Sequence, residues 1–345
     1  MNKKTSDVYF GFKEEIKNEN VLKFEANLSP QYKEYRRKWK EYPEKLIIPK
    51  FPLHLDIGIT SKCNLKCPMC TRTQLINQGI WTIPIKDLEF ELFKKAINEG
   101  APAGLCAVNF DNFGEPLINP DIFKMIKYAK DSGILDVFFH TNATLLNKKR
   151  ATNLIKSGLD KLIISFDSPY PKKYEKIRVG AKFDKVIENI KNFAKIKKDL
   201  QTIKPLTRIN CINFPGKTKK EKEDTIKLLS PIVDSVSFID YVDPVKTKKG
   251  IFPSNYISQF VCPQIITRLT VWEDGMISPC CMDYDRTLGL GNLKNNSLAS
   301  AWTSKKLKDI REKHIAGKFF EIPACRRCDY AVECDSALRQ KNMKK

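Results

Sequence analysis

The chain has 345 residues, of which 42% are hydrophobic, and it carries a formal net charge of +21 from 61 basic and 40 acidic residues. This composition excludes an intrinsically disordered chain and allows one large hydrophobic core, or one core with a smaller satellite. No apolar run approaches the ~20 residues that a membrane-spanning helix needs, and residues 1–4 lead into no apolar signal region, so we expect a cytoplasmic protein without a membrane partner.

The basic balance predicts attraction to an anionic partner. Nucleic acid, a phosphorylated or nucleotide-linked substrate, and an acidic electron donor such as flavodoxin or ferredoxin are the candidates. A well-solvated, lysine-rich surface explains the charge equally well, because the lysines are spread along the chain. Only 246–249 and the tail 341–345 are basic runs, and we expect both to be solvated. A small anionic substrate is therefore favoured over nucleic acid.

Residues 1–50 are polar and basic, and we expect them to form a helical extension of the body. Tyr32, Tyr35, Trp39 and Tyr42 recur at spacings of three and four, which predicts one amphipathic helix packed on the rest of the protein. Aromatic residues among basic ones also occur in nucleic-acid-binding surfaces, but one short stretch favours packing.

From Phe51 onward, apolar strand-like runs alternate with helical patterns. This alternation implies right-handed crossovers and a parallel sheet, so the fold class is α/β. Six strands fall short of the eight in a closed barrel, and functional groups in such folds gather at the carboxyl ends of the strands. The alternation stops near residue 245, which predicts a core at 51–245 and a cysteine-rich domain at 246–340. The expected strands are 53–59, 105–110, 134–140, 160–166, 206–213 and 234–240, and the expected helices lie near 86–99, 120–131, 147–157, 183–198 and 218–229.

Cys63, Cys67 and Cys70 follow the first expected strand with C-x3-C-x2-C spacing. Cysteines clustered in this way in a long chain indicate thiolate ligands in a reducing compartment rather than disulfides. Three thiolates can hold three corners of a four-iron cluster and leave the fourth iron open for a small molecule. Half of a zinc site is the alternative, but it needs a fourth ligand, and His54 lies upstream on the expected strand.

This triplet resembles the signature of the radical S-adenosylmethionine (SAM) enzymes. The resemblance implies a partial (β/α)6 barrel, which the strand count matches, and a 4Fe-4S cluster whose open iron chelates SAM. It also implies that one electron from the reduced cluster cleaves SAM to methionine and a 5'-deoxyadenosyl radical. The residue before the third cysteine is often aromatic in this family and packs against adenine. Here it is Met69, whose flexible thioether can cover a ring face.

The resemblance also assigns SAM contacts to the end of the second strand. Gly114, Glu115 and Pro116 resemble the family's Gly-Gly-Glu motif. Gly114 lies 44 residues after Cys70. Glycine lets the backbone approach a ligand closely, and a carboxylate suits the ammonium group of methionine. An isolated Gly-Glu-Pro is also an ordinary turn.

Later strand ends carry further residues that the family places near SAM or substrate. Asn142 follows the third strand, where its alternative role is to cap a loop. Ser165 and Asp167 follow the fourth strand, in a Ser-x-Asp pattern that the family places near the ribose and methionine of SAM. Arg178 could contact the SAM carboxylate, or form a surface salt bridge.

The C-terminal cysteines begin with a C-x12-G-x4-C pattern from Cys262 through Gly275 to Cys280. Between them, residues 272–276 predict a hairpin with a glycine turn. The later cysteines follow as C-x2-C-x5-C, at Cys325, Cys328 and Cys334.

These spacings resemble the SPASM domain and its shortened form, called twitch. A full SPASM domain carries two auxiliary clusters on seven cysteines, and two of those are missing here, so we expect one auxiliary 4Fe-4S cluster. The order and spacing of the cysteines are similar to those of 2-deoxy-scyllo-inosamine dehydrogenase, a radical SAM alcohol oxidase. A zinc ribbon is the alternative for this region. The ligands that the resemblance implies are Cys262, Cys280, Cys325 and Cys328, with Cys334 as an alternate to Cys328 and Cys281 as a spare thiol.

The resemblance implies an oxidoreductase that abstracts a hydrogen atom from its substrate. A nearby auxiliary cluster can accept an electron, so we expect oxidation or epimerisation of a sugar, sugar nucleotide or cyclitol. Asp240, Tyr241 and Asp243 follow the sixth strand and are candidates for a proton acceptor or for a hinge, whereas His140 is expected to be structural. The alternatives are maturation of a ribosomal peptide, by cross-linking or epimerisation, and RNA modification.

Overall fold

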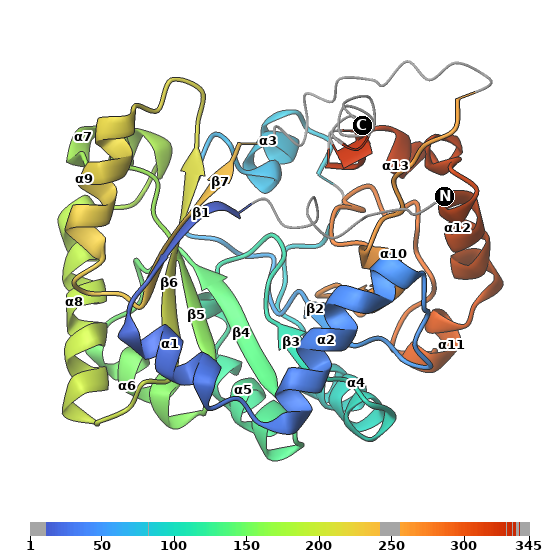
Figure 1. Cartoon of the computed structure of the whole chain (residues 1–345), viewed down its shortest axis with the longest axis horizontal. Helices are drawn as coiled ribbons and strands as arrows, with labels where there is room; N and C mark the ends of the chain where they lie inside the picture. The colour runs from blue at the N-terminus through green and yellow to red at the C-terminus, as the bar shows by residue number, and fades with distance from the viewer. Residues whose placement is uncertain are drawn as a thin grey trace.

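The computed structural model describes residues 12–81, 83–241 and 256–328, together with 330–332, 334, 335 and 338, and the side chains from residue 16 onward. Its centre is a curved nine-stranded sheet in the order β1-β7-β6-β5-β4-β3-β2-β8-β9 (Figure 1). Six strands in succession run parallel, and they confirm the six strands expected from the sequence. They are β2 (His54–Ile57), β3 (Ala107–Asn109), β4 (Asp136–Thr141), β5 (Lys161–Ser165), β6 (Leu206–Asn213) and β7 (Ser235–Asp240).

Helices between these strands cover the convex side of the sheet (Figure 1). Polar caps set where several of them begin: Asn147 accepts a hydrogen bond from the Arg150 N–H, and Thr218 accepts one from the Glu221 N–H. Their apolar stripes and the outward residues of the strands form one large core. The helices are α4 (Phe90–Ala103), α5 (Ile122–Asp131), α6 (Lys148–Lys156), α7 (Pro171–Ile177), α8 (Phe183–Asp199) and α9 (Lys219–Leu229).

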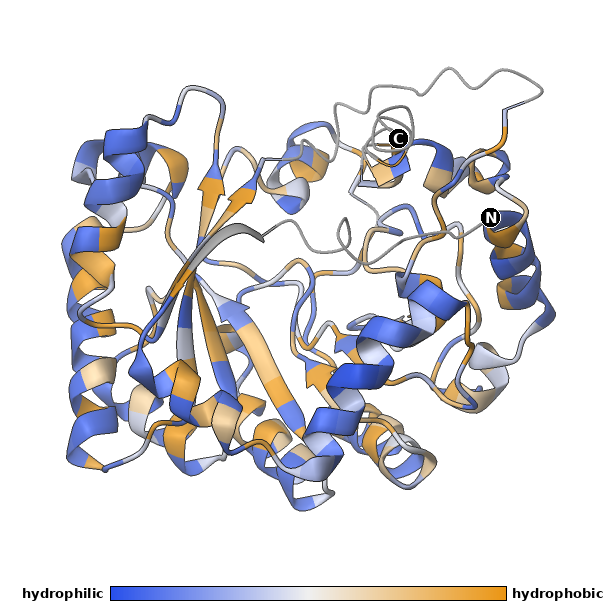
Figure 2. Ribbon diagram, in the orientation of Figure 1, coloured by the Kyte–Doolittle hydropathy of each residue, from blue (hydrophilic) through white to orange (hydrophobic). Residues whose placement is uncertain are grey.

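The N-terminal segment supplies both an edge strand and a helix on the concave side. β1 (Phe12–Lys17) pairs antiparallel with β7, and α1 (Glu19–Ala26) follows it; the sequence reading anticipated neither. α2 (Pro30–Lys45) is the expected amphipathic helix, capped by Ser29, and Figure 2 shows that most of its surface is hydrophilic.

The apolar side of α2 covers the amino-terminal part of the concave face. The Tyr32 hydroxyl donates a 2.8 Å hydrogen bond to Asp136, and Lys161 Nζ lies 2.6 Å from the same carboxylate. The Trp39 ring packs on His54 with 5.3 Å between ring centroids. Aromatic packing on the body, rather than nucleic-acid binding, is therefore what these aromatic residues do in the structure.

The C-terminal part extends the same sheet. β8 (Arg268–Val271) runs parallel to β2, and the predicted hairpin at 272–276 connects it to β9 (Ile277–Ser278), with Gly275 at φ +86°. Around them lie α10 (Gln264–Thr267), α11 (Leu298–Trp302), α12 (Lys305–Ile315) and α13 (Pro323–Arg326). The core sheet does not end at residue 245, because β8 continues it. The domain boundaries expected at residues 50, 245 and 340 therefore stay a proposal.

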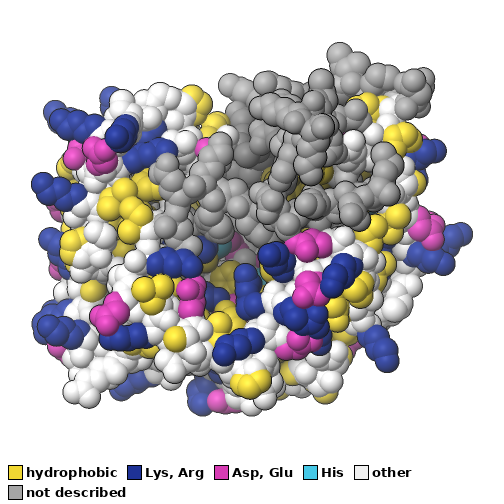
Figure 3. Space-filling view, viewed as in Figure 1, with side chains coloured by type: hydrophobic (Ala, Val, Ile, Leu, Met, Phe, Trp, Pro, Cys, Tyr) yellow, Lys and Arg dark blue, Asp and Glu magenta, His cyan; other side chains and the backbone are white. Residues whose placement is uncertain are grey.

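Basic side chains are dispersed over the described part of the face that Figure 3 shows. Figure 3 shows Lys and Arg across the visible face with Asp and Glu between them. Many of them are paired along helices, as in the 2.7 Å contact between Arg37 and Glu34. Exposed pairs of this kind contribute little to stability, and they are typical of a solvated surface. No helix in the described part of the chain combines the length and the apolar character needed to cross a membrane.

Candidate functional site

The cysteine triplet lies in the loop that leaves the carboxyl end of β2 and enters α3 (Thr71–Asn77). The Cys70 N–H donates to the Cys67 carbonyl at 3.0 Å, and the Leu65 N–H points at Cys63 Sγ at 3.5 Å. Cys67 is buried and the other two are half-buried, and no disulfide joins them. The loop therefore presents three thiols from eight residues at the end of the sheet where chemistry is expected.

Burial raises the pKa of two thiols in this loop. Burial raises the pKa of Cys67 to about 11, against the opposing effect of the nearby Arg178 guanidinium, and burial also raises the pKa of Cys63. Iron that binds here must displace these protons, as is usual for thiolate ligands.

Gly114 is the residue that allows the following loop to pack on the cysteine loop. A Cβ at this position would stand 2.1 Å from the Thr60 carbonyl oxygen and 2.8 Å from that of Lys62. The Glu115 N–H donates to the same Lys62 carbonyl at 2.8 Å. In this structure the glycine therefore serves backbone packing beside the triplet, whereas a contact with SAM stays a prediction.

Glu115 is buried and connects two strand ends. One carboxylate oxygen accepts hydrogen bonds from the Thr141 hydroxyl (2.7 Å) and the Leu117 N–H, and the other accepts one from the Asn142 N–H (2.8 Å). Burial raises its pKa to about 7. Pro116 begins the short 3-10 helix that follows, Pro116–Ile118. The predicted contact between Glu115 and the SAM ammonium group remains a proposal.

Asn142 joins the end of β4 to the cysteine loop. The side-chain nitrogen of Asn142 donates to Asn64 Oδ1 at 3.0 Å. Its side-chain oxygen, Oδ1, accepts hydrogen bonds from the Thr144 hydroxyl and N–H. Asn64, the residue after Cys63, in turn donates to Thr144 Oγ1 at 2.8 Å. Asn142 therefore caps its own loop and also lies beside the loop that carries the cysteine triplet.

Asp167 and Arg178 form a buried ion pair, not a surface salt bridge. Arg178 Nε lies 2.6 Å from Asp167, whose other oxygen accepts from the Ile212 N–H at 2.9 Å. The side chain of Arg178 is 12% exposed and that of Asp167 is fully buried. Ser165, at the end of β5, is half-buried, and Met69 packs partly buried against the main core.

Four C-terminal cysteines are close enough to influence one another electrostatically. Burial, with Cys328 as the next cause, raises the pKa of Cys262 to about 12. A hydrogen bond with Cys281 is the largest cause that raises the pKa of Cys280, and the thiols of Cys262 and Cys328 act on both Cys280 and Cys325. Cys334 also acts on Cys262, but it lies buried in a small apolar cluster with Phe260 and Phe319. Among the described residues, no three Cys, His, Asp or Glu side chains are arranged to hold a single metal ion.

Two of the three residues proposed as proton acceptors lie in the described part of the chain. Asp240 is exposed at the end of β7 and accepts a hydrogen bond from Asn213 at 3.1 Å. The Tyr241 ring packs on Phe214 at 5.1 Å. Asp243 lies outside the described residues.

The sequence reading missed a polar lining on the concave face, toward the carboxyl ends of the strands. His140 Nδ1 lies 2.6 Å from a carboxylate oxygen of Asp111, but the two groups do not have the geometry of a hydrogen bond. His140 Nε2 lies 3.3 Å from Asn210 Nδ2. The strand registers place further polar residues on this side. Buried oxygens that have no hydrogen-bond partner in the described structure belong to Asn109, Asn210, Ser237 and Thr270.

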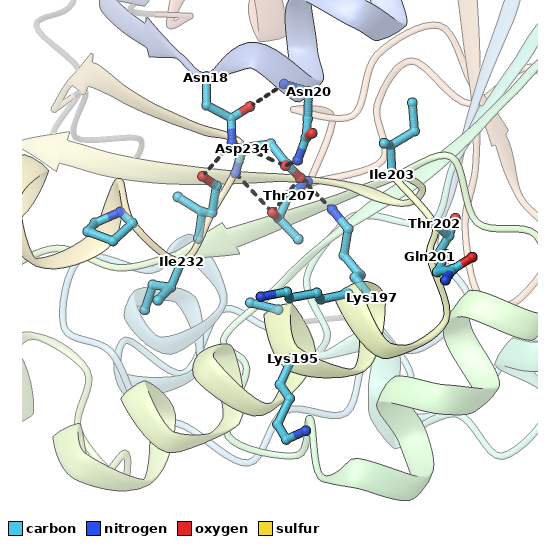
Figure 4. Close-up of a pocket in the computed structure, with 14 residues that line it drawn as sticks. Asn18, Asn20, Lys195, Lys197, Gln201, Thr202, Ile203, Thr207, Ile232 and Asp234 are labelled. Carbon is cyan, nitrogen blue, oxygen red and sulfur yellow. Dashed lines mark hydrogen bonds and ion pairs between the residues drawn. The ribbon is translucent and has the colours of Figure 1, made fainter.

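A separate cleft of about 560 Å³ lies at the opposite, amino-terminal ends of the strands (Figure 4). A buried ion pair of 2.6 Å between Lys197 and Asp234 closes one side of it. The Asp234 carboxylate also accepts hydrogen bonds from Thr207 and Asn20, so other residues of the protein satisfy both of its oxygens. In parallel β/α folds this end serves stability, and we assign the cleft no chemistry.

Comparison with known families supports the cluster interpretation. Residues 57–229 match the Radical SAM superfamily. The chain belongs to this superfamily. Residues 262–329 match SPASM, an iron-sulfur cluster-binding domain. Both resemblances expected from the sequence are therefore confirmed.

The curated proteins that this radical SAM protein resembles include a cyclase and a cofactor-modifying protein. GTP 3',8-cyclase of Clostridium botulinum is 28% identical over 207 residues, which cover 59% of this chain and 61% of the relative. The chain thus spans about three fifths of the cyclase. The tungsten-containing aldehyde ferredoxin oxidoreductase cofactor-modifying protein of Pyrococcus furiosus is 24% identical over 327 residues, covering 82% of this chain and 88% of the relative.

Solved structures share the fold at low identity. SuiB from Streptococcus suis bound to S-adenosylmethionine matches with a TM-score of 0.60 and 18% identity, covering 88% of this chain and 76% of that one. BtrN in complex with AdoMet and 2-DOIA matches with a TM-score of 0.53 and 17% identity, covering 82% and 94%. Native anSMEcpe with bound AdoMet matches at 0.58 and 16%, covering 84% and 96%. These likenesses show the fold alone.

Membership of the two families implies a SAM-binding 4Fe-4S cluster, auxiliary iron-sulfur ligation and SAM itself. The donor set fits such clusters, because it consists of thiols: three in one loop, and four that separate segments bring together. The assignment of the SAM-binding cluster to Cys63, Cys67 and Cys70 is a proposal that the spacing and the shared loop of these thiols support. The assignment of a single auxiliary cluster to Cys262, Cys280, Cys325 and Cys328 remains a proposal.

Proposed function

We propose that this radical SAM enzyme oxidises, or epimerises, a small hydroxylated molecule such as a sugar, sugar nucleotide or cyclitol. The observation that supports this most is the polar lining of the concave face. Buried carbonyl or hydroxyl oxygens of Asn109, Asn210, Ser237 and Thr270 have no partner in the described structure. Unpaired buried polar atoms are costly, so a lining of this kind is suited to a ligand with many hydroxyl groups.

The residues around the triplet would position the reacting groups. When bound, the clusters and SAM supply hydrogen-atom abstraction and electron transfer. The network of Asn142, Asn64 and Glu115 holds the cysteine loop against the end of β4. The buried pair of Asp167 and Arg178 keeps a positive charge beside Cys67, where it suits the carboxylate of SAM or the net negative charge of a thiolate-bound cluster.

The C-terminal cysteines favour oxidation over a redox-neutral rearrangement. Removal of a hydrogen atom from an alcohol carbon leaves one more electron to be lost before a ketone forms. An iron-sulfur cluster near the substrate is a suitable acceptor for that electron. The auxiliary ligand set therefore supports a dehydrogenase more than an isomerase.

The partners follow from the same reading. An anionic or sugar-like substrate agrees with the net charge of +21, and flavodoxin or ferredoxin would supply the electron that starts each turnover. The competing substrate class is a ribosomal peptide, since two matched structures are those of SuiB bound to precursor peptide SuiA and anSMEcpe bound to the Kp18Cys peptide.

The test is turnover of SAM by anaerobically reconstituted protein in the presence of candidate substrates. We expect 5'-deoxyadenosine and an oxidised product to form in a ratio near one with a cyclitol, amino sugar or sugar nucleotide. Release of 5'-deoxyadenosine that depends on a peptide and not on any of these compounds would overturn the proposal.

A further inference from the structure

Glu273 is a buried carboxylate near the concave face, and its own backbone N–H lowers its pKa against the effect of burial. It is 1% exposed, and neither of its oxygens is hydrogen-bonded by another described residue. It follows the carboxyl end of β8, on the hairpin of the SPASM region. A buried carboxylate in this state is costly to the folded protein, so its retention points to a ligand.

Asn112 places an equally unsatisfied donor beside it. Its buried Nδ2 has no hydrogen-bond partner in the described structure. A Cβ on Gly58 would lie 3.0 Å from this nitrogen and 3.2 Å from Glu273 Oε2. The two polar atoms therefore flank the same glycine and are separated by no more than the sum of those distances, yet they do not bond to each other. One hydroxyl oxygen between them can accept from the amide and donate to the carboxylate.

The two side chains are held in place by the residues next to them. The rings of Phe113 and Trp272 stack with centroids 5.4 Å apart and planes inclined by 28°. Phe113 follows Asn112 and Trp272 precedes Glu273, so the stack fixes one backbone against the other. Such a pair of aromatic rings stabilises the contact beyond its buried area. The two unsatisfied groups therefore lie at a packed junction between the superfamily core and the SPASM region.

We propose that Glu273 and Asn112 bind the substrate hydroxyl that is oxidised, and that Glu273 accepts its proton. This inference rests on the proposed function and adds a named site to it. Gly58, Asn112 and Glu273 follow the carboxyl ends of three neighbouring strands, β2, β3 and β8, on the edge of the sheet from which the cysteine loop also leaves.

The step balances with these participants. The alcohol C–H hydrogen leaves as an atom to the 5'-deoxyadenosyl radical, and the O–H proton passes to Glu273. The remaining electron goes to an oxidised iron-sulfur cluster of the C-terminal region, which leaves a C=O double bond. Burial raises the pKa of Glu273 to about 7. The charged groups that act on it are Arg286, Asp274 and Lys86, and Arg286 is itself paired with Asp274.

Isothermal titration of the reconstituted, SAM-loaded protein tests the site. The probes are myo-inositol, 2-deoxy-scyllo-inosamine, glucosamine and UDP-glucose. We expect at least one probe to bind, and Glu273→Gln to weaken its affinity at least tenfold without changing the affinity for SAM. Glu91→Gln is the matched control, because that side chain is 77% exposed on α4.

A second variant protects the test against misfolding of the first. Gly58→Ala keeps both polar side chains and adds a methyl group at 3.0 Å from one and 3.2 Å from the other, so it should weaken the same probe as strongly. With a probe that turns over, Glu273→Gln should also lower the oxidised product per 5'-deoxyadenosine at least tenfold at saturation.

The outcomes separate the inference from the proposed function. Unchanged probe affinity in both Glu273→Gln and Gly58→Ala would overturn the inference and leave the proposed function standing. Failure of every probe to bind the wild type, with SAM binding intact, would overturn the proposed substrate class and the inference with it.

Discussion

Gly114 packs directly on Thr60, so that a Cβ at residue 114 would stand 2.1 Å from the Thr60 carbonyl oxygen. The contact joins the loop after β3 to the loop that carries the triplet, and the hydrogen bond from the Glu115 N–H to Lys62 continues it. No rotamer change can relieve the clash, because both groups in conflict with the Cβ are backbone. The geometry of the cysteine loop therefore depends on this glycine.

Gly114→Ala should displace the cysteine loop and prevent stable assembly of the SAM-binding cluster. We expect the variant to lose about four iron atoms per chain after anaerobic reconstitution, while the auxiliary iron remains. Iron and sulfide analysis measures this loss. Gly104→Ala is a useful control, because that glycine has nothing within 4 Å of its ideal Cβ and lies away from the triplet, although its φ of +98° adds local strain. Full iron content in Gly114→Ala would contradict the packing argument.

The Cys63/Cys67/Cys70→Ala triple variant should separate the two clusters. Two four-iron clusters require about eight iron atoms per chain in the wild type and about four in the variant. Iron analysis with electron paramagnetic resonance of the reduced samples checks both numbers. A wild type with about four iron atoms and a variant with none would remove the proposed electron acceptor, and a redox-neutral reaction would then be the better hypothesis.

The sequence anticipated the elements that depend on local patterns. The six parallel strands are short apolar runs between turn residues, and the cysteine spacings are contiguous motifs, so both could be read directly. β1 was missed because its sequence, FKEEIK, is too charged to read as a strand, and its pairing with β7 is a long-range relationship. β8 was missed as a neighbour of β2 for the same reason.

The polar groups of the concave face could not be predicted from the sequence, for a related physical reason. Asn112, Glu273 and His140 look ordinary in the sequence, and only the fold reveals that their polar atoms are buried and how they are paired. The hypothesis that Asp240 or Tyr241 accepts a proton rests on position at a strand end alone, and it stays a prediction. Which side chains face the concave side follows from strand register, which a single sequence does not supply.

The ligands of the auxiliary cluster can be assigned by single substitutions. Cys328 acts electrostatically on Cys262, Cys280 and Cys325, whereas Cys334 is buried among Phe260 and Phe319. Cys328→Ala should therefore lose about four iron atoms, and Cys334→Ala should keep them. Cys281→Ala tests the thiol that is hydrogen-bonded to Cys280, and iron loss in this variant would make Cys281 a ligand. Iron loss in Cys334→Ala with retention in Cys328→Ala would make Cys334 the ligand.

The pH dependence of stability should reveal the unsatisfied carboxylate. Burial raises the pKa of Glu273 to about 7, above its ordinary value of 4.5. The folded protein therefore holds this proton more tightly than the unfolded chain, and the associated stability is lost as pH rises from about 4.5 to about 7. The full loss is on the order of 3 kcal/mol, since each pKa unit corresponds to about 1.4 kcal/mol.

Glu273→Gln removes this titration and keeps the shape of the side chain. The advantage of the variant over the wild type in free energy of unfolding should be about 2.5 kcal/mol larger at pH 8 than at pH 5, as measured by anaerobic denaturant titration at both values. Glu115, whose pKa burial also raises to about 7, is present in both proteins and cancels in the difference. A difference that is the same at pH 5 and pH 8 would show that residue 273 carries no shifted proton, and that its oxygens are satisfied in solution by groups such as water.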